Sequence, residues 1–229
     1  MGGRVKYSTL LFDADEVLFD FTKAEATAFD ATFRQYQLNP QDFRDDYTEI
    51  NHRLWKQFSA GEVSGEQLRV QRFDQLFKRH RLKLDASRAA ATYINILSQC
   101  GFLLPHALDA VAWCSTRFSI GLITNGLADV QRARLAHSGL ASYFPKVIIS
   151  EEVGYPKPHP RIFEIACEAL GEKDRSRILM IGDNYETDIV GATEFGIDTC
   201  WVNPKGGTDK KAIFTYHIDG INGLKSVVS

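Results

Sequence analysis

Two types of hydrophobic pattern divide the chain. Residues 10–12, Leu-Leu-Phe, form a short apolar run without polar alternation, which is typical of a strand buried on both faces of a parallel sheet. Residues 20–100 contain no such run and instead show the amphipathic spacing of helices. This spacing predicts four helices, at residues 24–36, 47–59, 65–79 and 87–100.

From residue 105 onward, short apolar runs alternate with helical segments. The expected strands and helices occupy residues 119–124, 146–150, 178–181 and 198–202, and residues 108–115, 129–138, 160–170 and 188–195, respectively. Strands that alternate with helices predict an α/β fold with a doubly wound parallel sheet. We therefore expect a core domain of residues 1–19 and 101–229, interrupted by an all-helical domain at residues 20–100 that lies over the site as a lid.

Composition limits the possible partners and compartments. The 229 residues include 27 basic and 29 acidic side chains, and the net charge of −2 does not favour a nucleic acid polymer as a partner. We expect a cytoplasmic protein without a membrane partner, because the chain has no signal-peptide pattern and no run of the ~20 apolar residues that a membrane span needs. The cysteines are too scattered to predict a zinc site or disulfides: Cys100, Cys114, Cys167 and Cys200.

Two aspartates follow the first expected strand. Ligands of an open parallel sheet bind beyond the carboxyl ends of its strands, which places Asp13 and Asp15 at the mouth of the crevice. Side chains two residues apart in an extended backbone share a face, so both carboxylates can reach the same small volume. A cation beside them would relieve their mutual repulsion.

Two further strand ends carry groups that suit an anion. Thr124, Asn125 and Gly126 end an expected strand before a helix, where a hydroxyl and backbone N–H groups can hold phosphate oxygens. Lys157 lies between two prolines, which reduce the entropy lost when its ammonium group is held in one place.

A fourth strand end is acidic. Asp183 ends the expected strand at residues 178–181, and Asp188 begins the next helix, an arrangement that suits an oxygen-ligated cation such as Mg²⁺. Each signal also has a plainer interpretation: turn or capping residues, an ordinary strand-to-helix turn, a solvated lysine and acids favoured by a helix dipole. All four together, each at a strand end of one sheet, favour an enzyme.

These motifs resemble those of the haloacid dehalogenase superfamily, specifically its phosphatases with a helical cap inserted after the first motif. The likeness spans nearly the whole chain. Segments 12–21, 123–126, 149–154 and 198–203 are similar to the bacterial pyrimidine 5′-nucleotidases. One departure is Val17, where many members carry threonine; valine also occurs in the superfamily, and we expect activity to be kept.

The resemblance implies a role for each aspartate. Asp13 would attack phosphorus and form an aspartyl-phosphate, while Asp15 would act first as general acid and then as general base. Mg²⁺ would be held by the Asp13 carboxylate, the main-chain carbonyl of Asp15 and Asp183. Asp188 would orient metal-bound water or the lysine rather than bind the metal.

The resemblance also implies that Thr124, Asn125 and Gly126 bind the phosphate and that Lys157 neutralises its charge. The expected substrate is a small phosphate ester, and the closest likeness points to pyrimidine nucleoside 5′-monophosphates. A sugar-phosphate or phosphoglycolate phosphatase, a phosphoglucomutase and a non-catalytic sensor of phosphorylated metabolites stay open as alternatives. The dehalogenases need no acid at the position of Asp15, which argues against that reaction.

Substrate choice is expected to lie in the helical insertion, where the sequence allows two interpretations. Aromatic side chains such as Tyr47 and Trp55 suit stacking on a base, and Arg69 or Arg72 suits a polar ring edge. Residues at helical spacing are more often part of a helical core or of a solvated face.

Overall fold

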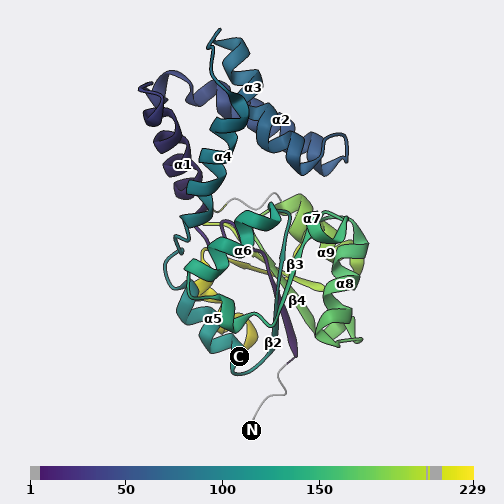
Figure 1. The fold of residues 1–229 in the computed structure, drawn as a ribbon. Helices are drawn as coiled ribbons and strands as arrows, with labels where there is room; N and C mark the ends of the chain where they lie inside the picture. The colour runs from purple at the N-terminus through teal and green to yellow at the C-terminus, as the bar shows by residue number, and fades with distance from the viewer. Residues whose placement is uncertain (1–5, 205, 207–212) are drawn as a thin grey trace. The chain divides into compact units, whose positions relative to one another are not determined.

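A parallel sheet with strand order β3-β2-β1-β4-β5-β6 forms the centre of the α/β unit (Figure 1). The computed structural model describes residues 6–204, 206 and 213–229. In that part of the chain, the strands are β1 (Thr9–Phe12), β2 (Ser119–Thr124), β3 (Lys146–Ile149), β4 (Ile178–Gly182), β5 (Asp198–Val202) and β6 (Tyr216–Ile218).

Helices cover both faces of this sheet. Successive residues of a strand point to opposite sides, so Leu10 and Phe12 join one apolar cluster and Leu11 joins the other. The first cluster includes side chains of α5, α6 and α10, the second those of α8 and α9. The helix bounds are α5 (Ala107–Ser115), α6 (Ala128–His137), α7 (Ser150–Val153), α8 (Pro160–Leu170), α9 (Gly191–Phe195) and α10 (Leu224–Val228). The predicted doubly wound parallel sheet is confirmed.

The strand order reverses direction at β1. The chain moves outward from β1 through β2 to β3, then crosses back so that β4 pairs with the other edge of β1. Thr9 is in register with both Ser119 and Ile178, so the carboxyl ends of the three strands lie at one edge. This reversal is the place where open α/β sheets bind ligands.

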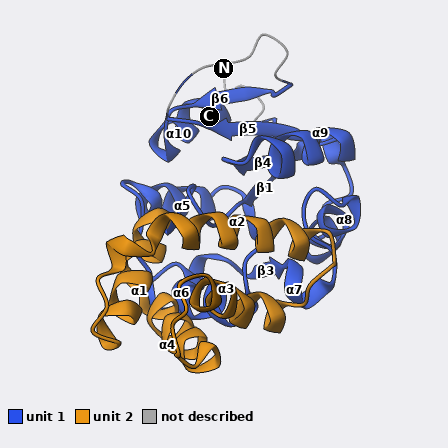
Figure 2. Ribbon diagram, turned by 90° about the horizontal axis from the view of Figure 1, so that it is seen from above, with its two compact units in different colours: residues 1–21, 101–229 blue, residues 22–100 orange. Residues whose placement is uncertain are grey.

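The second unit is helical. The chain forms two compact units: unit 1 comprises Met1–Phe21 with Gly101–Ser229, and unit 2 comprises Thr22–Cys100 (Figure 2). Aromatic side chains, among them Phe33, Tyr47 and Phe73, are buried in unit 2, and Ser64 and Gln67 form a capping box where α3 begins. Its helices are α1 (Phe21–Gln35), α2 (Arg44–Ser59), α3 (Gly65–Arg79) and α4 (Ala86–Gln99). No helix in the described residues is long and apolar enough to cross a membrane.

Some elements differ from the sequence-based expectation. The sequence pattern did not predict β6, because three residues with a central His217 carry too little periodicity. A helix was expected at residues 188–195, but a π-helical turn (Tyr185–Val190) precedes a short α9 there. Such wide turns are frequent at functional sites, and this one contains Asp188.

Candidate active site

Asp13 lies directly beyond the central strand β1. Its backbone N–H donates to the carbonyl of Ile181 on β4, 2.9 Å away, which continues the strand pairing by one residue. The residue is only 8% exposed, so its carboxylate is largely removed from water at the carboxyl edge of the sheet. A carboxylate in that position needs a charged or hydrogen-bonding partner.

Lys157 provides this partner. It is 2% exposed, and its Nζ donates to Asp13 Oδ1 at 2.6 Å and to the carbonyl of Ile123 at 3.1 Å. A third contact pairs Nζ with Asp188 Oδ1 at 2.7 Å. The three N–H groups of the ammonium can therefore all be used, and the buried charge is compensated by two carboxylates.

The side chain of Asn125 holds the loop that carries Lys157. Asn125 Nδ2 donates to the Lys157 carbonyl at 2.8 Å, and the Lys157 backbone N–H donates to Asn125 Oδ1 at 2.7 Å. The sequence suggested a role for this asparagine through its backbone N–H. Its side-chain contacts additionally connect the strand end at Thr124 to the lysine loop.

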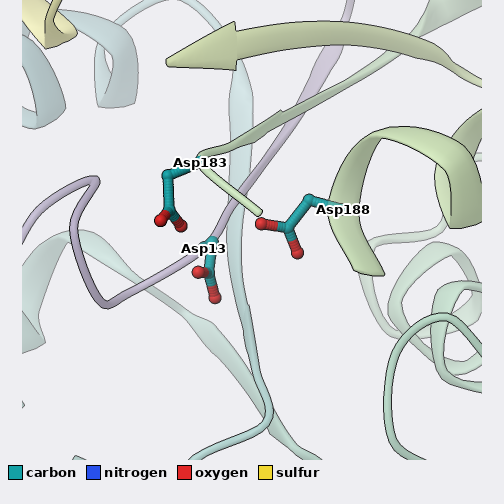
Figure 3. Close-up of side chains that lie close together, drawn as sticks. All are labelled: Asp13, Asp183 and Asp188. Atoms are coloured by element: carbon teal, nitrogen blue, oxygen red, sulfur yellow. The ribbon is translucent and has the colours of Figure 1, made fainter. Parts of the chain in front are cut away.

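Three carboxylates converge at the sheet edge (Figure 3). One oxygen from each of Asp13, Asp183 and Asp188 lies within 4.8 Å of the others. Asp188 reaches this position over Gly182, where an added Cβ would lie 2.3 Å from the Asp188 Cβ. Trp201 fixes the backbone of Asp183 by donating its indole N–H to the Asp183 carbonyl at 2.8 Å.

The electrostatics of this cluster favour an added cation. Burial raises the pKa of Asp13 well above its ordinary range; Lys157 opposes this shift, and Asp188 and Asp183 add to it. Burial and the charge of Asp188 raise the pKa of Asp183 to about 7. Burial alone would lower the pKa of Lys157, but Asp13 and Asp188 raise it. One ammonium therefore does not balance three carboxylates, and a hard cation with oxygen ligands fits the remaining charge.

Asp15 has its own set of contacts, from α6. Gln131 Nε2 donates to Asp15 Oδ2 at 2.7 Å, and an Arg134 guanidinium nitrogen donates to Asp15 Oδ1 at 2.6 Å. Gln131 Nε2 also lies 3.3 Å from Thr124 Oγ1, which in turn accepts the Gly126 N–H at 3.2 Å. Asp15 and the phosphate-binding candidates Thr124 and Gly126 thus belong to one hydrogen-bonded group.

The site residues expected from the sequence therefore form two groups at the same sheet edge, and the members of each group lie close to one another. Asp13, Lys157, Asp183 and Asp188 form the first, with Asn125 behind the lysine loop. Asp15, Thr124 and Gly126 form the second.

The sequence analysis missed Gln131, Arg134 and Trp201. The first two stand three residues apart on one helix after the Thr-Asn-Gly motif, a spacing that indicates a shared polar face. Phe19, one of the aromatic side chains after the first motif, is fully buried with its ring against the Arg134 guanidinium.

Several known proteins have sequences similar to that of this chain. A model of the haloacid dehalogenase-like hydrolases matches residues 7–196. The chain is 37% identical to pyrimidine 5′-nucleotidase YjjG of Escherichia coli, over 87% of each chain. It is 35% identical to pyrimidine 5′-nucleotidase PynA of Streptococcus pneumoniae, over 86% of this chain and 84% of that protein.

A solved structure agrees with these sequence matches. The putative hydrolase YfnB of Bacillus subtilis, described as bound to magnesium, superimposes with a TM-score of 0.88 at 32% identity. The match covers 97% of this chain and 99% of that one. With its fold, its motif residues and its relatives in agreement, the chain belongs to the haloacid dehalogenase-like hydrolase family.

Proposed function

We propose that this hydrolase is a Mg²⁺-dependent phosphatase that acts through an aspartyl-phosphate, with pyrimidine nucleoside 5′-monophosphates as substrates. The observation that carries the proposal is the buried Asp13 carboxylate, bonded to Lys157 and grouped with Asp183 and Asp188. In this proposal Asp13 is the nucleophile, Lys157 is a fixed positive charge beside it, and Asp13 and Asp183 provide carboxylate ligands for a cation.

In the proposed first step, an Asp13 oxygen attacks the phosphorus of the ester, and the bond from phosphorus to the leaving oxygen breaks. Asp15 donates a proton to that oxygen, so the alcohol leaves neutral. The phosphoryl group is then an acyl phosphate on Asp13, and one difficult hydrolysis has become two easier displacements.

In the second step, water attacks the phosphorus of the aspartyl-phosphate. Asp15, now a carboxylate, accepts a proton from this water, and the bond between phosphorus and the Asp13 oxygen breaks. Inorganic phosphate leaves and both aspartates return to their starting forms. Asp15 is only partly buried, with 26% of its side chain exposed, which leaves it accessible to water.

Charge on the transferred phosphoryl group needs fixed donors nearby. Lys157 supplies a positive charge within hydrogen-bond distance of the nucleophile. We assign the Thr124 hydroxyl and the backbone N–H groups of Asn125 and Gly126 to the phosphoryl oxygens, since backbone donors at a strand-to-helix turn suit an anion. Such preorganised donors stabilise charge as it develops in the transition state.

The residues present fit Mg²⁺. Asp13, Asp183 and the main-chain carbonyl of Asp15 would hold the ion, while Asp188 positions Lys157 through their ion pair. When bound, the ion supplies positive charge that favours the carboxylate forms and offsets the charge of the phosphate. This fits the raised pKa of Asp13, which as a nucleophile must be deprotonated.

The proposed substrate class rests on the two relatives named as pyrimidine 5′-nucleotidases. We further propose that residues 20–100 act as a cap that determines which alcohol is accepted. Unit 2 buries Tyr47 within its own helices, so recognition of the base is assigned to other, more exposed side chains of this unit.

Phosphate release from a substrate panel tests this function. The panel contains UMP, dUMP, dTMP, CMP, AMP, GMP, phosphoglycolate and glucose phosphates, each with Mg²⁺ or EDTA. We expect turnover of the pyrimidine nucleotides that EDTA abolishes and that Asp13→Asn lowers by about 10³-fold or more. The matched control is Asp109→Asn, since Asp109 is an exposed aspartate on α5.

Each outcome has a distinct meaning. Turnover restricted to sugar or glycolate phosphates would keep the mechanism and refute the nucleotide substrate. Transfer of the phosphoryl group to a second hydroxyl of a sugar, in place of free phosphate, would indicate a mutase. Absence of any turnover, combined with thermal stabilisation by a phosphorylated metabolite, would indicate a sensor.

A further inference from the structure

Two side chains of α6 contact the proposed acid–base residue although neither belongs to the motif set. Gln131 is 2% exposed and Arg134 is fully buried. Residues three apart lie on the same face of a helix, and here that face points to Asp15. A buried guanidinium is costly unless it is paired, and the Asp15 carboxylate provides this pairing.

The two side chains bind different oxygens of the Asp15 carboxylate. Gln131 Nε2 donates to Oδ2 at 2.7 Å, and Arg134 donates to Oδ1 at 2.6 Å. The Arg134 nitrogen also lies 3.5 Å from Gln131 Oε1. With both oxygens held, rotation of the carboxylate about its side-chain bonds is restricted.

Gln131 reaches Asp15 through space left by a glycine. A Cβ added to Gly126 would lie 2.2 Å from Gln131 Nε2 and 2.6 Å from its Cγ. The same Nε2 lies 3.3 Å from Thr124 Oγ1. Gln131 therefore connects the Asp15 carboxylate to the strand end that we assign to phosphate binding.

Arg134 is itself held in place by aromatic rings. Its guanidinium carbon lies 4.5 Å from the ring centroid of Phe19 and 5.4 Å from that of Phe21, within cation–π distance. Both rings follow Asp15 in the segment after β1. In contrast, Arg132 on the same helix has a side chain that is 54% exposed and pairs with Glu152.

We propose that Gln131 and Arg134 are positioning residues that hold the Asp15 carboxylate in the orientation for proton transfer. The proposal rests on the phosphatase function above. Proton transfer requires the carboxyl oxygen within about 2.6–3.2 Å of the leaving oxygen, so an unrestrained Asp15 side chain would populate many unproductive orientations. Support from buried neighbours gives the precision that a flexible side chain lacks.

Leaving-group dependence distinguishes a positioning role from a merely structural one. kcat/KM reports the steps up to departure of the alcohol. The alkoxide of an alkyl phosphate leaves poorly without a proton, whereas nitrophenolate leaves readily without one. A misplaced Asp15 should therefore slow the alkyl ester far more than p-nitrophenyl phosphate.

Two variants, Gln131→Met and Arg134→Met, remove the hydrogen-bond donors to Asp15 but keep a similar side-chain volume. Arg134→Lys is the conservative variant, because it keeps the positive charge. Arg132→Met is the matched control on the same helix. For the alkyl phosphate that the wild type cleaves fastest, we expect kcat/KM to fall about 10- to 100-fold, part of the roughly 10²- to 10⁴-fold contribution of general acid catalysis. For p-nitrophenyl phosphate we expect a change within about threefold. Arg134→Lys should recover part of the loss, and Arg132→Met should match the wild type on both esters.

An equal loss on both esters, or no loss on either, would overturn the positioning role. Gln131→Met removes no charge, so the proposal is tested even where Arg134→Met does not fold. The wild type separates the two proposals. Failure of the wild type to release phosphate from either ester would refute the phosphatase function, whereas an active wild type with uniformly weakened variants refutes only the role of the α6 pair.

Discussion

Replacement of Lys157 by methionine should unbalance the charge of the site more than any other single change considered. The Nζ of Lys157 lies 2.6 Å from Asp13 and 2.7 Å from Asp188, and the two carboxylates are nearly or fully buried. Lys157→Met keeps much of the side-chain volume and removes the only ammonium in contact with this pair among the described residues. The two carboxylates then face each other without compensation.

The size of the effect follows from burial. Removal of one partner of a buried ion pair costs about 3–5 kcal/mol, because the remaining charge is left uncompensated. A chain of this length loses about 2–4 °C in Tm per kcal/mol, so we expect the metal-free variant to melt roughly 6–20 °C below the metal-free wild type. Total stabilities of about 5–15 kcal/mol leave the variant folded at low temperature.

Thermal unfolding followed by circular dichroism, in EDTA and in Mg²⁺, measures this difference. The deficit should be smaller at pH 5 than at pH 8, since protonation of a buried carboxylate removes the uncompensated charge. Mg²⁺ should recover part of it at pH 8. Activity should fall by about 10²- to 10³-fold, as expected when one fixed charge is lost from a transition-state site.

The matched control is Lys173→Met, because Lys173 is an exposed lysine in the loop after α8. Its Tm and activity should equal those of the wild type. A metal-free Lys157→Met protein that melts within about 3 °C of the wild type at pH 8, a shift expected from roughly 1 kcal/mol, would refute the charge balance inferred here.

Three other predictions concern Asp183 and its surroundings. The pKa of Asp183 is raised from 3.8 to about 7, so between these pH values the folded metal-free protein binds more protons than the unfolded chain. Its free energy of unfolding, measured relative to Asp183→Asn, should therefore fall as the pH rises from about 4 to 7. A difference in stability between the two proteins that does not change with pH, in melts with EDTA, would contradict this. Trp201→Phe removes the indole donor to the Asp183 carbonyl and should weaken Mg²⁺ binding by about 10-fold in calorimetric titration, with unchanged affinity as the opposing result. Gly182→Ala would place a Cβ 2.3 Å from the Asp188 Cβ, and urea unfolding should show a loss of about 1–3 kcal/mol; a neutral effect would mean that the π-helical turn yields easily.

The sequence predicted the framework of the α/β unit well. Buried strands such as residues 10–12 carry continuous apolar runs, and these depend only on local burial, so the amino-acid pattern is sufficient to locate β1 to β5. The edge strand β6 was missed for the same reason, since Tyr216–Ile218 is neither long nor continuously apolar. The division into a core domain and a cap domain after residues 19 and 100 stays a prediction. The structure divides into compact units after Phe21 and Cys100.

Three of the motif residues could be found from sequence because each one ends a strand or directly follows it, whereas Lys157 lies in the loop after α7 and Asp188 in the π-helical turn. Asp13, Thr124 and Asp183 follow or end β1, β2 and β4, and parallel strands bring their carboxyl ends to one edge of the sheet. Their chemistry, carboxylates beside hydroxyl and lysine groups, then indicates phosphate and a hard cation. For these residues, local sequence and one topological rule were sufficient.

Only the tertiary structure decided how these side chains are held. Lys157 contacts Asp13 across 144 positions of sequence, and Arg134 contacts Asp15 across 119. Such contacts depend on how α6 and the lysine loop pack against the sheet, which no local periodicity encodes. The sequence by itself determined the buried strands β1 to β5 and the chemical groups that end or directly follow β1, β2 and β4. The three-dimensional packing determined that the Lys157 ammonium is shared by two buried carboxylates and that Gln131 and Arg134 of α6 bind the Asp15 carboxylate. The physical reason is that distances between side chains are set by the packing of helices and loops on the sheet, and not by the order of the residues in the chain.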